Sequence, residues 1–500
     1  MSLPQAAATE SKAGDRGLDH STIRSIVVGI MLAMFLSAME QTIVGPALPT
    51  IGRVLGDIEN LSWVVTAYLL SATAVTPLFG KLSDIYGRRT VMLVCVGIFI
   101  VGSAACALAP NMWTLILGRA LQGVGGGGIL PIAQTIIADM MSPRERPRWQ
   151  AYFATMFMAA ATIGPVLGGF LTDQLHWSLI FWINVPLGII ALLMSDSALR
   201  RLPRYDRPHR LDLIGAFLMV GATITLLLAL GWGGTHYRWL SPQILGLIAA
   251  SLALWALFAL RLLTAPEPFI PLSMLREPVV GIITFVGFFS IGTVVGLSLV
   301  LPIYLELVLS LSASGSGTVM IAFMAGTTLG SVVAGRLLVR LDRYKWVAIV
   351  GLMIGLIGLL ILAWKPTALS VAVVAAVLLI GGGGLGVMYP FTTVVIQNVV
   401  PLHQMGTATG TLNFFRLLGS AIIVAVFGAI VLGSVGIEGG LAAISAKRMG
   451  ADFATAFQYV FLTAAFFVVL SLIAVILIEE RPLRGVISAA PNPAAPVAAQ

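Results

Sequence analysis

The sequence predicts an all-α polytopic membrane protein. Of its 500 residues, 58% are hydrophobic and only 10% are charged, whereas a soluble domain carries about 25% charged residues. Apolar runs of about 20 residues, each long enough to cross a bilayer as a helix, recur along the chain. The alternating segments of about ten residues that build a membrane β-barrel do not occur in the sequence. Helices are therefore expected to make every crossing.

We predict fourteen membrane-spanning helices. They cover residues 26–48, 61–80, 90–109, 112–140, 149–171, 179–198, 212–232, 242–263, 279–309, 316–339, 346–364, 369–397, 407–432 and 455–478. The polar N-terminal tail is not expected to be a cleavable signal, because the first apolar run is long and no small-residue cleavage site follows a short core. The Ala- and Pro-rich C-terminal tail is expected to be unstructured.

The basic residues predict the orientation of these helices. If both termini are cytoplasmic, the inner segments hold 22 of the 29 Lys and Arg residues and the outer loops hold five, while Arg119 and Arg416 lie inside spans. Cytoplasmic loops of membrane proteins carry such an excess. The bias also explains the net charge of +8 through topology and anionic lipid, so no nucleic-acid partner is expected. We predict a multi-pass protein of the cell (inner) membrane.

Two halves of the chain repeat one another. Segment 80–89 is matched by segment 335–345, and the glycine run 125–128 is matched by 381–384, in both cases after about 255 residues. Parallel six-helix repeats place a binding site between the halves near the membrane midplane. The predicted parts are a cytoplasmic tail (1–24), an N-terminal six-helix half (25–198), a cytoplasmic linker with two inserted helices (199–276), a C-terminal six-helix half (277–480) and a cytoplasmic tail (481–500).

Glu40 is a carboxylate inside the first apolar run. A charge at the centre of such a helix costs about 2.5–3.5 kcal/mol on insertion scales, and acids there usually face a protein interior or a water-filled path. We predict that Glu40 exchanges a proton; the alternative is a neutral Glu40 hydrogen-bonded to a neighbouring helix. Arg119, which shares a helix face with Gln122, is the candidate partner of Glu40, unless it donates to carbonyl groups of the first helix.

Segment 80–89 predicts a latch that holds one conformation at the cytoplasmic mouth. Its motif residues are Gly80, Asp84, Gly87, Arg88 and Arg89. The glycines allow a tight turn, Asp84 can pair with a basic residue or a helix N-terminus, and the two arginines can donate to carbonyl groups at helix ends. The alternative is ordinary cytoplasmic charge. The second copy has Val339 where Asp84 aligns, so it is expected to latch weakly or not at all.

The fifth helix carries small residues at every fourth position, namely Ala160, Gly164 and Gly168. This spacing predicts a flat face for a close helix crossing. Pro165 removes a backbone donor and is expected to bend the helix. The residues assigned to this motif are Gly164, Pro165, Gly168 and Gly169.

Together these stretches resemble the major facilitator superfamily, specifically its fourteen-helix drug:proton antiporters (QacA/EmrB-like multidrug efflux transporters). Segments 40–49, 80–89, 119–127 and 160–169 are similar to four signatures of that family. The resemblance implies the major facilitator fold, with two six-helix halves and two inserted helices, and export in exchange for protons, with Arg119 implicated in proton transfer. Glu40 stands where the family more often has Asp. Gly45 and Pro46 replace Asn-Val and are expected to bend the first helix.

Aromatic and polar side chains on several helices are candidates for a substrate pocket. The candidates are Trp63, Tyr68, Gln122, Glu306, Tyr389, Phe414 and Arg416. Aromatic faces together with an acid would suit a bulky amphipathic cation. The alternative for each aromatic residue is contact with lipid or core, and Glu306 is equally consistent with a solvated edge position and with a second proton or cation site.

We therefore expect a proton-coupled antiporter that exports amphipathic drugs or other small organic compounds across the cytoplasmic membrane by alternating access. A dedicated exporter of one metabolite, siderophore or lipid on the same fold is the alternative. An enzyme is not expected, because no His, Asp or Glu residues cluster at a membrane face in the sequence. The expected partners are a small-molecule substrate, protons and the lipid bilayer, with a periplasmic adaptor protein left open. The proton gradient is the energy source, and no cofactor or metal is expected.

Overall fold

The computed structural model describes residues 20–57, 60–141, 145–200, 211–234, 236–341, 343–435 and 451–481. Most of the two predicted tails and residues 201–210 of the predicted linker lie outside the described residues. Within the described part of the chain, fourteen helical segments are long and apolar enough to cross a membrane. The prediction of an all-α protein with fourteen spans is confirmed.

The N-terminal half contains the first six spans. Its elements are α1 (His20–Ile43), η2 (Gly45–Ala47), α2 (Leu48–Leu55), α3 (Trp63–Tyr86), α4 (Arg88–Ala107), α5 (Met112–Met140), α6 (Arg146–Gln174), α7 (Leu179–Trp182) and α8 (Asn184–Leu199). The first span is interrupted by the one-turn 3₁₀ helix η2, which has Pro46 near its start. The expected break beyond Glu40 is therefore present, because proline cannot donate the backbone hydrogen bond that would continue α1.

The inserted pair and the C-terminal half follow. The inserted helices are α9 (Leu213–Trp232) and α10 (Pro242–Thr264), followed by the short α11 (Leu272–Leu275). The C-terminal half consists of α12 (Pro278–Leu307), α13 (Ala313–Arg340), α14 (Lys345–Trp364), α15 (Val371–Gly386), α16 (Met388–Val399), η3 (Leu402–Gln404), α17 (Met405–Val435) and α18 (Ala451–Leu477). The twelfth predicted span is thus divided into α15 and α16.

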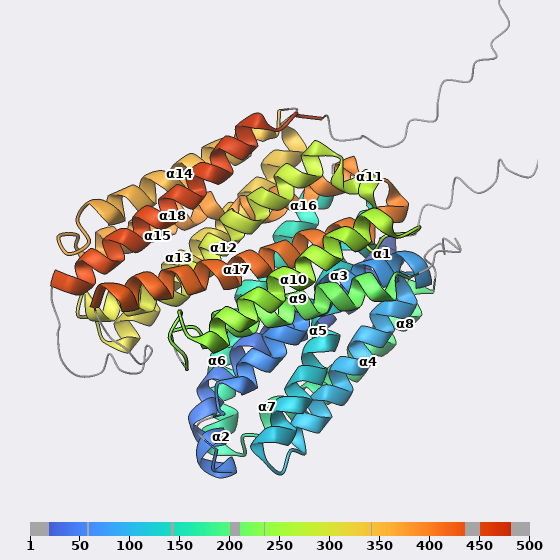
Figure 1. The fold of residues 1–500 in the computed structure, drawn as a ribbon, viewed down its shortest axis with the longest axis horizontal. Helices are drawn as coiled ribbons and strands as arrows, with labels where there is room; N and C mark the ends of the chain where they lie inside the picture. The colour runs from blue at the N-terminus through green and yellow to red at the C-terminus, as the bar shows by residue number, and fades with distance from the viewer. Residues whose placement is uncertain are drawn as a thin grey trace, which may run out of the picture.

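Each half is organised around an apolar core of its own. One core is built entirely from residues between Ile26 and Leu199. The other joins the C-terminal half to the inserted helices and includes Ala138 of α5. In Figure 1 the blue N-terminal half lies below the orange and red C-terminal half, and the two come together near α11 and the start of α1.

The inserted helices α9 and α10 lie across the seam between the halves (Figure 1). Helix α9 contacts both α3 and α17. Trp232 of α9 meets Trp63 edge to face, with ring centroids 5.7 Å apart, and Trp255 of α10 lies 6.1 Å from Phe414. The pair is therefore packed against both halves.

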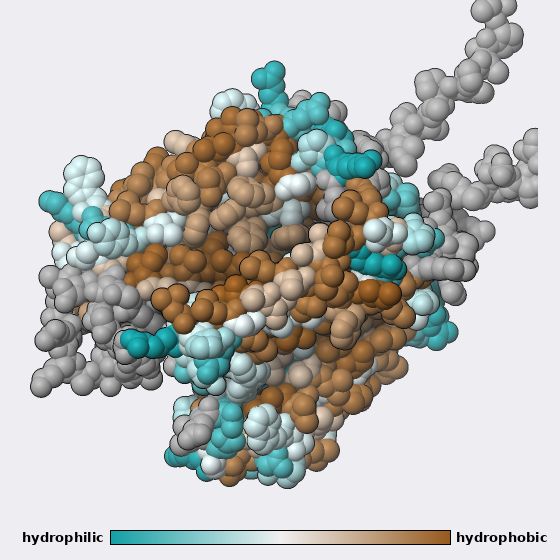
Figure 2. All heavy atoms as spheres, in the orientation of Figure 1, coloured by the Kyte–Doolittle hydropathy of each residue, from teal (hydrophilic) through white to brown (hydrophobic). Residues whose placement is uncertain are grey.

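The surface carries the apolar band that a membrane-spanning protein requires. Figure 2 shows hydrophobic residues over the middle of the molecule and hydrophilic residues gathered at its ends. Large side chains such as Phe217, Leu240 and Trp364 are exposed. Exposed apolar area on this scale is stable in lipid and would drive association in water.

Segment 80–89 differs from the predicted loop. Helix α3 continues to Tyr86 and α4 starts at Arg88, so Gly87 alone links them. Residues 81–86 contain no Pro or Gly to end the helix, whereas Gly87 adopts a φ of 86°, a left-handed conformation that glycine tolerates best. The motif therefore consists of the last turns of α3, the single connecting residue Gly87 and the first residues of α4.

Candidate functional site

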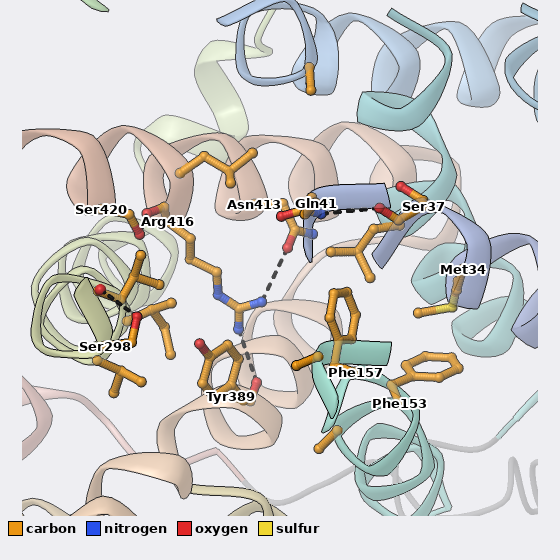
Figure 3. Close-up of a pocket in the computed structure, with 18 of the residues that line it drawn as sticks. Met34, Ser37, Gln41, Phe153, Phe157, Ser298, Tyr389, Asn413, Arg416 and Ser420 are labelled. Carbon is orange, nitrogen blue, oxygen red and sulfur yellow. Dashed lines mark hydrogen bonds between the residues drawn. The ribbon is translucent and has the colours of Figure 1, made fainter. Parts of the chain in front are cut away.

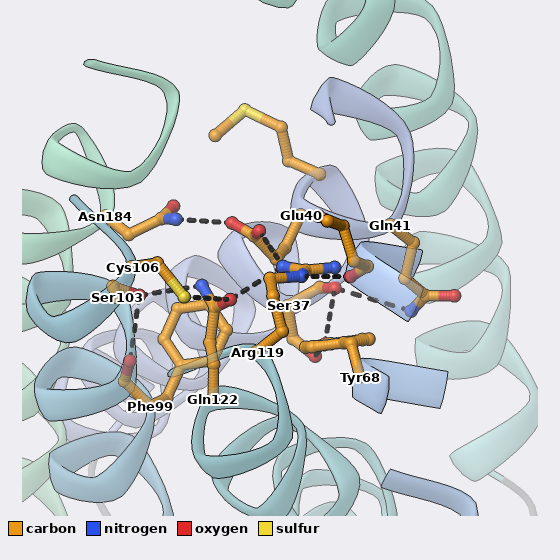
Figure 4. A network of polar contacts seen from close by, with 12 residues as sticks. Ser37, Glu40, Gln41, Tyr68, Phe99, Ser103, Cys106, Arg119, Gln122 and Asn184 are labelled. Carbon is orange, nitrogen blue, oxygen red and sulfur yellow. Dashed lines mark hydrogen bonds and ion pairs between the residues drawn. The ribbon is translucent and has the colours of Figure 1, made fainter. Parts of the chain in front are cut away.

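Glu40 and Arg119 form a buried ion pair between α1 and α5 (Figure 4). Nη1 of Arg119 donates to Oε1 of Glu40, and the Asn184 amide donates to Oε2. Glu40 is 0% exposed and Arg119 is 1% exposed. A buried charge is tolerated when it is paired and hydrogen-bonded. The predicted partnership of Glu40 and Arg119 is confirmed.

Further polar groups fix the guanidinium of Arg119. Its Nε donates to the carbonyl oxygen of Val64 on α3 at 2.7 Å, whereas the alternative expected from the sequence was a carbonyl group of α1. Its Nη1 also donates to Oε1 of Gln122 at 2.6 Å, and the amide of Gln122 donates in turn to Ser103. The Tyr68 ring lies beneath the guanidinium, 4.5 Å from its carbon to the ring centroid. Five helices, α1, α3, α4, α5 and α8, thus contribute to the network around one carboxylate and its counter-ion.

Helix α6 crosses α1 next to this pair through its small residues. A Cβ added at Gly164 would collide with the Thr42 side chain, and one at Gly168 would collide with the carbonyl group of Ile43. The Thr42 hydroxyl donates to the carbonyl oxygen of Ala160 at 3.2 Å. The predicted close crossing is confirmed, and α1 is the neighbour. Glu40 therefore lies at most three residues from the crossing point.

A cavity of about 430 Å³ lies between the two halves (Figure 3). Both halves line it, through α1, α3, α5 and α6 on one side and α12, α13, α16 and α17 on the other. Its volume falls within the range of about 300–1,000 Å³ that is usual for small-molecule sites. This position matches the binding site predicted between the halves.

Three of the seven pocket candidates line this cavity, namely Tyr68, Tyr389 and Arg416. The other four lie elsewhere. Trp63 packs on α9, Phe414 is buried against α10, and Gln122 belongs to the Arg119 network. Glu306 is exposed at the end of α12. Phe414 and Arg416 both lie on α17, but only Arg416 reaches the cavity, because residues two apart on a helix point in different directions.

Ser37 and Tyr68 form the wall between the cavity and the ion pair. Both line the cavity, and the Tyr68 hydroxyl lies 3.4 Å from Oγ of Ser37. On its other face the Tyr68 ring contacts the guanidinium of Arg119. Gln41, adjacent to Glu40 in sequence, also lines the cavity. One layer of side chains therefore separates the guanidinium of the ion pair from the cavity.

Asp84 connects the two halves at one end of the molecule. Its Oδ1 accepts from the Gly406 amide at 3.0 Å, and its Oδ2 accepts from the Thr407 amide and hydroxyl at 2.6 Å each. These are the first groups of α17, where a carboxylate is favoured by the helix dipole. The backbones of Gly80 and Gly406 approach so closely that a Cβ on either would collide with the other. The expected pairing of Asp84 with a helix N-terminus is confirmed.

The arginines of the same motif bind carboxylates, and among the described residues the expected contacts with helix-end carbonyl groups are not found for them. Arg88 pairs with Asp84 and, through Nε at 2.8 Å, with Asp139 at the end of α5. Arg89 pairs with Asp196 of α8. A carboxylate accepts both edges of a guanidinium and so outcompetes a carbonyl group. The motif therefore joins α3, α4, α5, α8 and α17.

More polar contacts join the halves at this end. The Asn413 amide donates to Oε1 of Gln134 at 2.7 Å, and both residues line the cavity. Arg146 donates to the carbonyl oxygen of Gln397 at 3.0 Å. Hydrogen bonds between the two halves thus close the cavity at the end of the molecule that carries Asp84.

Sequence reasoning missed several of these residues. They are Ser103, Gln134, Asp139, Asn184, Asp196, Gln397 and Asn413. Each is a polar residue within or at the end of an apolar run, and polar residues at such positions usually face the bundle interior. Among the described residues, no group of three or more His, Cys, Asp or Glu side chains is placed to hold a metal ion.

A central cavity between two helical bundles, with a buried ion pair beside it and a polar closure at one end, defines a membrane transporter. The comparison with known proteins names the family. A model of the Major Facilitator Superfamily matches residues 30–212 and 195–424, and the chain belongs to this superfamily. The family resemblance seen in the sequence motifs is confirmed.

Two relatives from Bacillus subtilis (strain 168) are similar over most of their length. The chain is 35% identical over 406 residues to the multidrug transporter protein MdtP, covering 81% of this chain and 74% of that protein. It is 31% identical over 411 residues to multidrug resistance protein 3, covering 82% and 80%. The crystal structure of the human organic anion transporter MFSD10 (TETRAN) matches with a TM-score of 0.64 and 19% identity, covering 90% of this chain and 99% of that chain. At that identity the match shows the fold alone. The chain is therefore a transporter of this superfamily and not an enzyme.

Proposed function

We propose that this protein exports small amphipathic compounds in exchange for protons, and that Glu40 carries the proton. The observation that carries the proposal is the buried Glu40–Arg119 pair, one side-chain layer from the cavity. Arg119 stabilises the ionised carboxylate, and a proton can replace Arg119 as its counter-charge when the pair separates. If Glu40 pairs with Arg119 in one conformation and binds a proton in the other, proton movement is coupled to the conformational change.

The position of the pair supports coupling. Glu40 lies within three residues of the α1–α6 crossing at Thr42 and Ile43, and the η2 break follows directly, so a rearrangement of α1 against α6 would move it. Asp84, Gln134 and Arg146 close the cavity at the end that carries the basic loops. We propose that this end is cytoplasmic, as the positive-inside rule predicts. The described conformation would then be closed toward the cytoplasm.

The test is substrate-dependent proton release from everted membrane vesicles, followed with a fluorescent ΔpH probe while a compound panel is added. The wild-type protein is expected to dissipate the gradient when a substrate is present. Glu40→Gln removes the titratable group and keeps the size and hydrogen-bonding capacity, so it is expected to abolish this release. Normal proton release by Glu40→Gln would refute the proposed role.

A matched control is Glu306→Gln, because Glu306 is also an acid on a membrane helix but is exposed and away from the cavity. Its proton release is expected to match the wild type. Membrane levels of both variants are compared by immunoblot. The breadth of the panel response distinguishes a multidrug exporter, which the two Bacillus relatives' names favour, from an exporter dedicated to one compound.

A further inference from the structure

Arg416 is a buried cation in the cavity that proton exchange does not explain. It lies on α17, is 6% exposed and lines the cavity (Figure 3). Nη1 donates to Oδ1 of Asn413 at 3.2 Å. Nη2 donates to the Tyr389 carbonyl oxygen and the Thr393 hydroxyl at 2.9 Å, and to the Thr392 hydroxyl. In the part of the chain that the structure describes, all these acceptors are neutral.

The charge of Arg416 is thus incompletely compensated. Its Nε is buried with no hydrogen-bond partner. A guanidinium that leaves water loses several kcal/mol of solvation, on the order estimated for buried ions, and neutral acceptors return only part of it. Arg119 shows the contrasting case in the same chain, since it has a carboxylate partner. Among the described residues, Arg119 has a carboxylate counter-ion and Arg416 has none.

The composition of the cavity lining points to the source of the missing charge. Arg416 is the one Lys, Arg, Asp or Glu among the described residues that line the cavity. The remaining lining is apolar or carries neutral polar groups, with Phe153 and Phe157 of α6 on the wall that faces α17 (Figure 3). A lining with one cation and no acid disfavours a cationic ligand and favours an anionic one.

We propose that the cavity binds amphipathic organic anions, with a carboxylate paired to Arg416 and the apolar body packed against Phe153 and Phe157. Guanidinium and carboxylate groups match in geometry and form charge-assisted hydrogen bonds. This assignment rests on the proposed export function and specifies its substrate class. It replaces the amphipathic cation suggested by the aromatic residues alone, because the acid that such a cation needs is not on the described lining.

The test compares three probes that share a naphthalene body and differ in charge: 1-naphthaleneacetate, the neutral 1-naphthaleneacetamide and the cationic 2-(1-naphthyl)ethylamine. Binding to purified full-length protein is measured by equilibrium dialysis. The wild type is expected to bind the acetate at least tenfold more tightly than the amide, and the amine most weakly. Arg416→Gln is expected to lower acetate affinity to the level of the amide while amide affinity is unchanged. Arg416→Lys is expected to retain part of the preference for the acetate.

Unchanged amide binding shows that Arg416→Gln keeps the cavity intact, and Arg416→Lys provides the second variant if the glutamine protein does not fold. Equal or tighter binding of the amide or amine by the wild type would overturn the assignment. So would an undiminished acetate preference in Arg416→Gln, or the absence of binding by all three probes. Dialysis needs no proton gradient, so a failure here leaves the Glu40 result standing, and a failure of the Glu40 test leaves this result standing.

Discussion

Asp84 of α3 accepts hydrogen bonds at 2.6 Å from both the backbone amide and the hydroxyl group of Thr407 on α17. A carboxylate of the N-terminal half therefore caps the first turn of a helix in the C-terminal half. The same carboxylate is paired with Arg88, which also binds Asp139. The contact that closes the halves is thus part of a network that also fixes the corner between α3 and α4.

Asp84→Asn is expected to shift the protein away from the described conformation. The substitution removes the charge from contacts worth about 1.5–3 kcal/mol each, which is enough to change a population ratio about tenfold. Spin labels at Val54→Cys and Glu306→Cys, both exposed and at the end of the molecule opposite Asp84, report the separation of the halves. Cys95 and Cys106 are buried and are not expected to be labelled. We expect Asp84→Asn to increase the short-distance population.

The control for this measurement is Asp173→Asn, which removes an exposed acid near the end of α6. Its distance distribution is expected to match the wild type. If the Asp84→Asn distribution coincides with the wild type as well, the contact with Thr407 does not hold the conformation.

Gly168→Val is expected to impair both stability and transport. A Cβ at this position would lie 3.0 Å from the carbonyl carbon of Ile43 and closer to its oxygen, so α6 must move away from α1. Overpacking of this kind costs about 1–3 kcal/mol. The measurements are the Tm of detergent-purified protein and substrate-dependent proton release.

Gly169→Val is the matched control, because the nearest atom to a Cβ there is Cβ of Pro46 at 4.0 Å. Both substitutions replace a helical glycine by the same residue, so their helix propensities cancel. Equal effects of the two substitutions would show that the α1–α6 contact is not the cause.

Arg119→Met is expected to destabilise the protein by about 3–5 kcal/mol, because it leaves Glu40 as an unpaired buried carboxylate. The double variant Glu40→Gln/Arg119→Met removes both charges and is expected to recover part of this loss. Urea or thermal unfolding of the two single variants and the double variant gives the coupling energy. Strictly additive effects would mean that the two side chains do not stabilise one another.

The fold and the centre of the site follow from the sequence for physical reasons. An apolar run of membrane length has one stable form in lipid, so the spans can be read directly. A buried carboxylate and a buried guanidinium need each other, so Glu40 and Arg119 can be paired across 79 positions in sequence. The small residues at every fourth position of α6 identify a crossing, although α1 is identified as its partner only by the structure.

The residues that sequence reasoning misplaced depend on helix rotation and on competition between acceptors. Phe414 and Arg416 are two residues apart, yet α10 covers the first and the cavity receives the second. Arg88 and Arg89 had several possible acceptors, and the carboxylates of Asp139 and Asp196 come within reach only after α5 and α8 have packed. Such outcomes depend on tertiary packing, which local patterns do not specify.

The separation of the two apolar cores has a consequence for the energy of the transport cycle. Since the core of residues 26–199 is complete within one half, the halves can rotate against each other without exposing its leucine and phenylalanine side chains. The contacts between the halves at the Asp84 end include hydrogen bonds that water can replace, among them those of Asp84, Gln134 and Arg146, beside the close packing of Gly80 on Gly406. In the proposed transport cycle, breaking these polar contacts would cost little because water offsets their loss, and the binding of one proton or one small molecule would be enough to shift the equilibrium between conformations.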